Sequence, residues 1–411
     1  MNENMLMQYA RLVAGVGINV QKGQTVVVRC PVDCAAFGRM LNQACFELGA
    51  RDVVMEWRDD FCSRERYLHA DDSVFDSNYP WDVQKNAELG KAGAGYITIA
   101  ASDPENLRGV DPDRLSRKRD ADGRDQKEFY RMMMSNGFPW CVVSVPVASW
   151  AKKVFPNDTD DAAMEKLWDA IFAAVRVRED GDAVQAWREH CAHLDEYAAK
   201  LNALKLTQLR YQNALGTDVT VGMPKEHLWL AGADSAKSGV RFVANMPTEE
   251  VFSAPKRDAV DGVLVASKPL ALNGNVIEGI RLTLEHGRIV GIHADTNEDV
   301  LRQAIETDEG AHYLGEIALV PVDSPIAQSG LLFYNTLFDE NAACHFAFGQ
   351  AYPACVPNGD NLSEEELIRR GLNIESSTHV DFMVGTEDLS IIGTTKDGRE
   401  VTVFENGRFA L

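Results

Sequence analysis

The chain has 411 residues, 45% of them hydrophobic, so it is long enough for two domains or one large domain with a sizeable core, and a wholly disordered chain is excluded. Its formal net charge of -21, from 62 acidic and 41 basic residues, repels phosphate backbones and anionic lipid surfaces. We therefore expect no nucleic-acid partner and no membrane partner.

The N-terminal region lacks the basic start and the unbroken apolar segment of a signal peptide. The apolar segment 140–150 is too short to span a bilayer and contains a proline. The 8 cysteines are scattered without a C-x-x-C pair, in a chain large enough to fold without disulfides, so we expect reduced and mostly buried thiols. These features predict a cytoplasmic protein.

Strand and helix signals alternate in the first half of the chain. Residues 25–30 and 52–57 are short runs rich in β-branched side chains, and 35–49 between them has helical spacing of its apolar residues. Two further strands are expected at 96–101 and 140–145. This β-α-β order predicts a mostly parallel sheet covered by helices.

Helical spacing takes over between residues 162 and 209, and strand signals dominate after about residue 211. The expected strands of this second half are 216–223, 261–267, a hairpin at 280–294 that turns at His286-Gly287, 317–322, 345–349, 378–385 and a closing pair around 396–404. A single clear helix is expected at 297–305, capped by Thr296. We predict an α/β N-terminal domain, 1–210, that includes a helical connection, and an α+β, strand-rich C-terminal catalytic domain, 211–411.

Two of the expected strands have one polar face and one apolar face. Alternate residues of a strand point to opposite sides, so His379 and Asp381 share one face while the apolar residues between and after them share the other. The strand at 345–349 repeats the pattern, with His345 on one face and Phe346 and Phe348 on the other. A histidine in such surroundings is either a hydrogen-bonded core residue or a ligand.

Carboxylates accompany these histidines along the second half. Glu249 and Glu250 lie between two prolines on a rigid loop, where the alternative reading is surface charge. Glu316 immediately precedes an apolar run, where a charge must be paired or coordinated, and a salt bridge or an exposed strand end are the alternatives. Glu340 lies five residues before His345, and Tyr352 follows that strand closely enough to place a phenol near the same point.

Carboxylates and imidazoles brought together repel one another or lose charge unless a cation holds them. Oxygen and nitrogen ligands without a thiolate suit Zn, Mn, Co or Mg, and four carboxylates with two histidines fit two ions that share a carboxylate. A nucleophilic Cys344 beside His345 is disfavoured because neighbours in a strand point apart. The glycine-rich segment 90–95 precedes a strand, whereas a phosphate loop follows one, so nucleotide binding is not supported.

Several long segments, in this order, resemble the metal-binding segments of the thermophilic-type metalloaminopeptidases, the aminopeptidase T/aminopeptidase S family. They are MPTEEVFSAP, GEIALV, NTLFDENAACH with the trailing GQAY, and THVDFMVG. GINVQKGQTVVV, GARDVV and GTDVTVGMP are also similar to that family, so the resemblance covers essentially the whole chain. SAPKRD and PNGDNLSEEELIRRG match less closely.

The resemblance implies a homodimeric, dinuclear metallopeptidase that removes N-terminal residues from peptides with a free N-terminus. It places the metal ligands at Glu250, Glu316, Glu340, His345, His379 and Asp381, and the active-site tyrosine at Tyr352. The implied reaction is attack by a water activated by two divalent ions, with Glu249 as the candidate general base. The alternatives are a metal-stabilised protein that binds peptides or amino acids without turnover, and a dinuclear hydrolase of another amide or ester.

Overall fold

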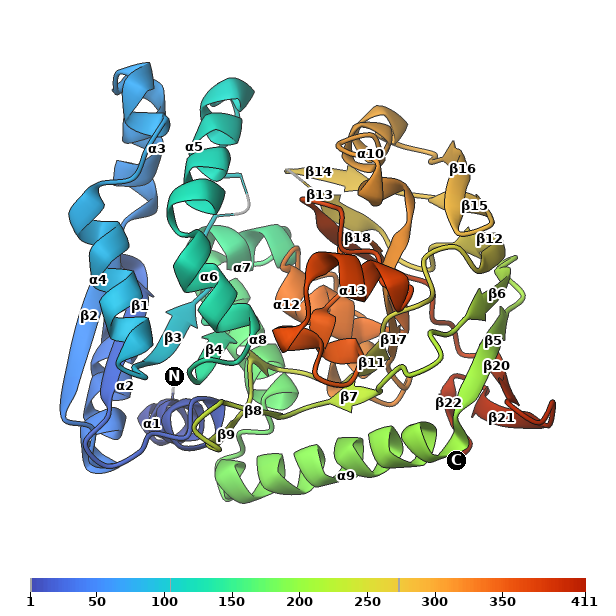
Figure 1. The fold of residues 1–411 in the computed structure, drawn as a ribbon. Coiled ribbons are helices and arrows are strands. Elements are labelled where there is room, and N and C mark those ends of the chain that lie inside the picture. Colours follow the sequence, from blue (N-terminus) through green and yellow to red (C-terminus); the bar gives the residue numbers. More distant parts are fainter. Residues whose placement is uncertain (1, 104, 273) are drawn as a thin grey trace. The chain divides into compact units, whose positions relative to one another are not determined.

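The computed structural model describes residues 2–103, 105–272 and 274–411. The chain forms two compact units (Figure 1). Unit 1 contains Met1–His190 and Ala233–Pro247, and unit 2 contains Cys191–Gly232 and Thr248–Leu411. The predicted division into domains 1–210 and 211–411 remains a prediction, because compact units do not establish which segments fold independently.

Unit 1 is built on a parallel five-stranded sheet with the order β10-β4-β3-β1-β2. Its strands are β1 (Thr25–Pro31), β2 (Asp52–Arg58), β3 (Gly95–Ile99), β4 (Trp140–Val143) and β10 (Asn245–Met246). The first four agree with the sequence-based expectation, whereas β10 comes from a segment that returns to unit 1 after a long excursion. A two-stranded ribbon, β8 (Asp234–Ser235) with β9 (Arg241–Phe242), precedes it.

Helices cover both faces of this sheet. On one face, Phe37 of α2 lies with its ring centroid 5.1 Å from Tyr9 and 6.5 Å from Trp168. On the other face, Tyr96 of β3 packs against Phe129, at 5.0 Å. The helical segments are α1 (Glu3–Leu12) with the π turn Val13–Gly17, η2 (Val32–Cys34), α2 (Ala35–Glu47), α3 (Asp60–His69), η3 (Asp72–Phe75), α4 (Pro80–Lys91), α5 (Pro112–Asp125), α6 (Lys127–Met134), α7 (Ala148–Val154), α8 (Asp160–Ala174) and α9 (Ala183–Leu204), which ends in unit 2.

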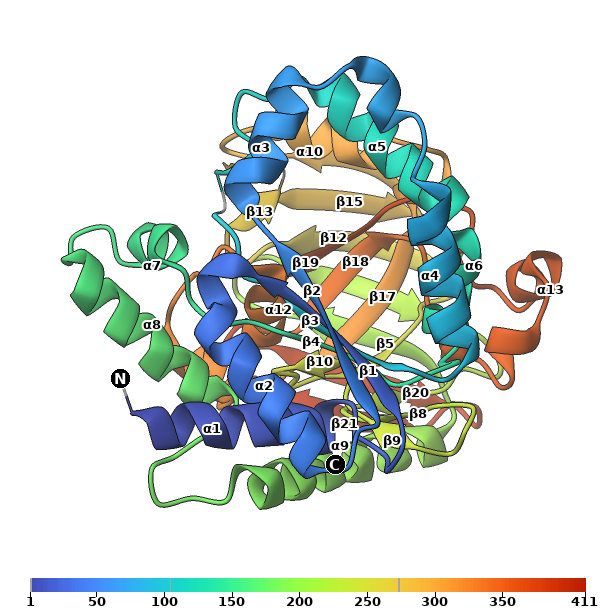
Figure 2. The ribbon, with the colours of Figure 1, turned by 90° about the vertical axis from the view of Figure 1, so that its left-hand side faces the viewer.

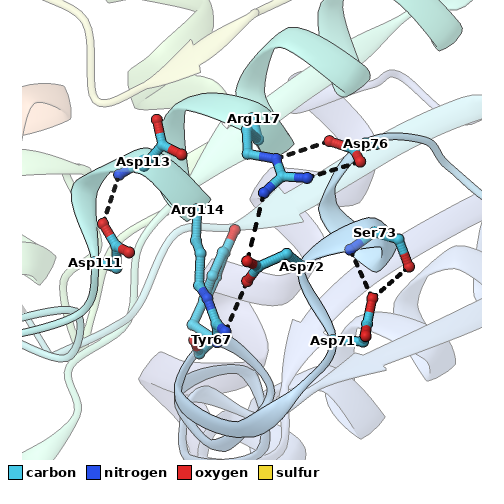
Figure 3. Close-up of polar contacts among 9 residues, drawn as sticks. All are labelled: Tyr67, Asp71, Asp72, Ser73, Asp76, Asp111, Asp113, Arg114 and Arg117. Atoms are coloured by element: carbon cyan, nitrogen blue, oxygen red, sulfur yellow. Dashed lines mark hydrogen bonds and ion pairs between the residues drawn. The ribbon is translucent and has the colours of Figure 1, made fainter.

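Ion pairs join η3 and α5 at the surface of unit 1 (Figure 3). Arg117 forms a bidentate ion pair with Asp76, in which Nε donates to Oδ1 at 2.8 Å and Nη2 donates to Oδ2 at 2.7 Å. Arg114 pairs with Asp72 at 2.7 Å and donates to the Tyr67 carbonyl at 2.6 Å. Exposed pairs of this kind contribute little stability.

Unit 2 contains an antiparallel eight-stranded sheet with the order β16-β15-β12-β6-β5-β20-β21-β22. Its strands are β5 (Leu206–Gln212), β6 (Asp218–Gly222), β12 (Val260–Val265), β15 (Arg281–Glu285), β16 (Arg288–His293), β20 (Ser390–Thr395), β21 (Glu400–Glu405) and β22 (Arg408–Phe409). His286 and Gly287 turn the predicted hairpin with φ of 50° and 82°, as a two-residue hairpin loop with both φ positive requires. A short ribbon, β13 (Leu270–Leu272) with β14 (Asn275–Ile277), lies outside this sheet.

A second antiparallel sheet of unit 2 has the order β19-β18-β17-β11-β7. Its strands are β7 (Leu230–Ala231), β11 (Val251–Ser253), β17 (Leu314–Leu319), β18 (His345–Gly349) and β19 (His379–Met383). One hydrophobic core contains Phe346, Phe348 and Phe382 of this sheet together with residues of the larger sheet. The predicted fold class, an α/β N-terminal part and a strand-rich C-terminal part, is confirmed.

The helical segments of unit 2 correct two expectations. Besides α10 (Glu298–Ile305) there are α11 (Pro325–Ser329), α12 (Thr336–Asp339), α13 (Glu364–Arg369) and the short turns η4 (Gly310–His312), η5 (Glu340–Ala342), η6 (Pro353–Cys355) and η7 (Gly359–Asn361). Thr296 does not cap α10: the N-cap is Asn297, at φ 52° and ψ 39°. The Thr296 hydroxyl instead accepts from the Glu278 N–H at 3.0 Å, because the two residues form a β-bridge.

Among the described residues, no helix combines the length and apolarity of a membrane span.

Candidate metal centre

Three neighbouring strands of unit 2 place two carboxylates around a small residue. Glu316 on β17 is paired with Ala347 on β18, and Ala347 is paired with Asp381 on β19. Residues directly opposite one another in an antiparallel sheet share a face, so the two acids flank the Ala347 methyl group. This methyl group leaves the space above β18 to the acids, and β17, β18 and β19 can be followed side by side in Figure 2.

A bulge sets the direction of Glu316. The register of β17 against β18 shifts between Leu314 and Glu316, which leaves Gly315 unpaired. A Cβ at Gly315 would lie 2.5 Å from the carbonyl oxygens of Gly349 and Gln350, so only glycine allows this approach. The expectation that Glu316 precedes its strand is wrong: it lies inside β17, all of whose residues are buried, because the bulge lets a carboxylate enter an apolar strand.

His379 faces the two acids that flank Ala347. Its Nε2 lies 3.1 Å from Glu316 Oε2 and 3.4 Å from Asp381 Oδ1. Its Nδ1 donates to the Gln350 carbonyl at 2.7 Å, since a carbonyl can only accept. That bond places a proton on Nδ1, so Nε2, which faces the two carboxylates, is the nitrogen that could bind a metal. Potential ligand atoms of Glu316, His379 and Asp381 all lie within 4.8 Å of one another.

A second triad contains His345, which is 2% exposed. Its Nε2 lies 3.2 Å from Glu250 Oε2, and its Nδ1 donates to the Ala343 carbonyl at 3.2 Å. Potential ligand atoms of Glu250, Glu316 and His345 also lie within 4.8 Å of one another. Glu316 is thus common to both triads, as a carboxylate between two ions would be.

The remaining predicted site residues lie around these triads. Glu340 belongs to neither triad; burial, and then the charges of Glu250 and Asp381, raise its pKa well above its usual value. The Tyr352 ring centroid is 5.1 Å from that of His379, and burial followed by the nearby carboxylates raises the pKa of the phenol well above its usual value. Glu249 is 3% exposed and belongs to neither triad.

The protonation of the site reflects crowded acids. Burial lowers the pKa of His345, but Glu250 and two further carboxylates outweigh it and raise that pKa to about 10. Burial raises the pKa of Glu316, although the bond from His379 opposes the shift. Burial also raises the pKa of Asp381, and here His379 outweighs it and lowers the pKa. Buried carboxylates and imidazoles this close together need a proton or a cation between them, and divalent cations fit the donor set.

The sequence did not reveal two groups that hydrogen-bond to site residues, a backbone carbonyl and a side-chain amide. The Gln350 carbonyl orients His379, and no residue-type signal marks a backbone acceptor. Asn341 accepts from the Glu249 N–H at 2.7 Å, and its place directly after Glu340 is the signal that would have drawn attention to it.

Carboxylates and imidazoles that converge on one sheet face define the chain as a protein with a candidate divalent-metal centre. Comparisons with known proteins assign the family. The family model described as thermophilic metalloprotease (M29) matches residues 2–409. The chain is 45% identical over 405 residues to aminopeptidase AmpS of Bacillus subtilis (strain 168), covering 98% of each chain.

It is also 39% identical over 410 residues to aminopeptidase T of Thermus aquaticus, covering 99% of this chain and 98% of the relative. The solved structure of wild-type AmpT from Thermus thermophilus matches with a TM-score of 0.92 and 37% identity, covering 100% of both chains. The chain therefore belongs to the thermophilic metalloprotease (M29) family, which confirms the resemblance, and it is an enzyme of the peptidase class.

Proposed function

We propose that the protein is a dinuclear metal-dependent aminopeptidase that releases N-terminal amino acids from peptides. The observation that carries the proposal is the pair of triads that share Glu316. The named relatives support the exopeptidase activity, since they are aminopeptidases over essentially the whole length of this chain.

The proposed ligands divide between the two ions. Glu250, Glu316 and His345 would hold one ion, and Glu316, His379 and Asp381 the other. Glu340, which belongs to neither triad, is proposed as a further ligand on the family resemblance. The donor set accepts Zn, Co, Mn or Mg. When bound, the ions would lower the pKa of a water and polarise the scissile carbonyl.

Two residues of the chain would act on the substrate. A tyrosine phenol keeps its proton at neutral pH, and burial raises the pKa of Tyr352 further, so its hydroxyl can donate to the oxygen that gains charge as the carbonyl is attacked. Glu249 is our candidate for the base that takes the proton from water and delivers it to the leaving amine. The surrounding carboxylates favour a substrate whose free α-amine is cationic.

The proposal also covers the catalytic domain, the oligomeric state and the cellular compartment. All proposed ligands belong to residues 211–411, which we therefore propose as the catalytic domain. We also propose a homodimer that works in the cytoplasm on peptides with a free N-terminus. The family resemblance supports the homodimer, and the eight scattered cysteines support a reducing compartment.

The test compares one peptide series with free and with blocked N-termini, using protein before and after chelation and again after a divalent ion is restored. We expect cleavage of free peptides only, its loss with the chelator and its recovery with the ion. Equal cleavage of free and blocked peptides contradicts the aminopeptidase, and hydrolysis that survives complete metal removal contradicts the metal mechanism. Bound metal without any turnover favours the binding protein.

A further inference from the structure

Asn341 is a buried amide beside the metal centre, with 0% exposure. Its Oδ1 accepts from the Glu249 N–H at 2.7 Å. Its Nδ2 donates to the Leu337 carbonyl at 3.1 Å and lies 3.4 Å from Glu340 Oε1. One amide thus connects the loop that carries Glu250 to the turn that carries Glu340, although 92 residues separate Glu249 from Asn341.

The orientation of this amide is determined at both ends. The oxygen meets an N–H donor and the nitrogen meets two acceptors, so a flipped amide would set donor against donor and acceptor against acceptor. The backbone carbonyl of Asn341 is held as well, because it accepts from the Ser324 hydroxyl at 3.3 Å. In a buried setting, leaving any of these groups unpaired is costly, so the two segments have one favoured relative position.

We propose that Asn341 is a positioning residue that holds Glu250 and Glu340 at the separation that metal binding requires before an ion arrives. This inference rests on the proposed metal site. Ligands held in advance lose little freedom when they bind, so removing the amide should weaken metal binding while every proposed ligand remains. Partners that orient metal ligands typically contribute about 10–100-fold in affinity, and we expect that range for Asn341→Ala.

The experiment measures the affinity of full-length protein for a divalent ion by competition with a coloured chelator, in the wild type, Asn341→Ala, Glu250→Gln and Asn202→Ala. Asn202 is the matched control, since its amide also bridges distant backbone, accepting from the Trp229 N–H at 2.9 Å and donating to the Trp229 carbonyl at 2.8 Å. The visible spectrum of the cobalt-loaded proteins is recorded in parallel, because it reports ligand geometry and a purely structural role would not change it.

The expected result is weaker binding and an altered cobalt spectrum in Asn341→Ala, with the Asn202→Ala values equal to wild type. Wild-type affinity and spectrum in Asn341→Ala overturn the positioning role, and leave the metal site standing if Glu250→Gln binds weakly. Wild-type affinity for both ions in Glu250→Gln contradicts the metal site and the positioning role with it.

A measurement on the wild type covers the case in which Asn341→Ala does not fold. Hydrogen exchange of the Glu249 amide is followed in metal-free protein. Slow exchange supports a loop already held by Asn341, whereas exchange at the rate of an unprotected amide overturns the proposal.

Discussion

Ala347→Val fills the space between Glu316 and Asp381, the two acids that form a triad with His379. The substitution adds two methyl groups to a fully buried position whose strand neighbours are Glu316 and Asp381. Overfilling a packed site costs about 1–3 kcal/mol of unfolding free energy. The added methyl groups lie where the carboxylates converge, so we also expect metal affinity to fall by about 10–100-fold, the range for changes to groups that orient ligands.

Phe348→Leu provides the matched control on the core face of the same strand. Loss of buried apolar volume costs about 1–3 kcal/mol, so its effect on stability is comparable, but it leaves the ligand face unchanged. Denaturant unfolding of metal-free protein gives the stability of each variant, and chelator competition gives its metal affinity. The reasoning is refuted if Ala347→Val binds metal as the wild type does, or if Phe348→Leu loses affinity to the same extent.

Three further perturbations probe the ligands and their orientation. His379→Ala and Asp381→Asn should lose bound metal and turnover while the metal-free protein still folds, and unfolding with unchanged metal content would count against their assignment. In Gly315→Ala the new Cβ would lie 2.5 Å from the Gln350 carbonyl oxygen, the group that orients His379. Metal affinity measured by chelator competition should therefore fall by about tenfold. Unchanged affinity would show that the Gln350 carbonyl does not control metal binding through His379. The pKa of His345 in metal-free protein is about 10, above its usual 6.5, so its stabilising contribution is complete below pH 6.5 and is lost as the pH rises towards 10. Unfolding free energy measured from pH 7 to 10 should therefore fall more steeply in the wild type than in His345→Gln, and equal slopes would show that this group does not carry the effect.

Local patterns account for the parts of the fold that the sequence predicts well. The strand His345–Gly349 has the predicted bounds, because its polar and apolar residues alternate with a clear period, and the helix Ala183–Leu204 lies inside the segment 162–209 that was predicted to be helical. The strand Asn245–Met246 was not predicted, since two residues carry no period and their partner lies about a hundred residues earlier. Thr296 was misread as a cap because its competing β-bridge to Glu278 is a tertiary contact.

In the site too, local patterns could be predicted, whereas features that depend on tertiary contacts could not. The alternating faces around His345 and His379 could be predicted, because a strand of period two separates ligands from core residues. The place of Glu316 inside its strand could not, because it depends on the bulge at Gly315 and on the carbonyls that approach it. The role of Asn341 depends on a contact with a loop 92 residues away in sequence, and one chain without its fold does not reveal such a pairing.

The number of ions bound by wild-type protein and by Glu316→Gln and Glu250→Gln tests the central claim most directly. Metal is counted by mass spectrometry after equilibration with a divalent ion. We predict two ions per chain in the wild type, loss of both in Glu316→Gln because this carboxylate belongs to both triads, and retention of one in Glu250→Gln. A single ion in the wild type, or two ions retained by Glu316→Gln, would contradict a dinuclear centre built on this shared carboxylate.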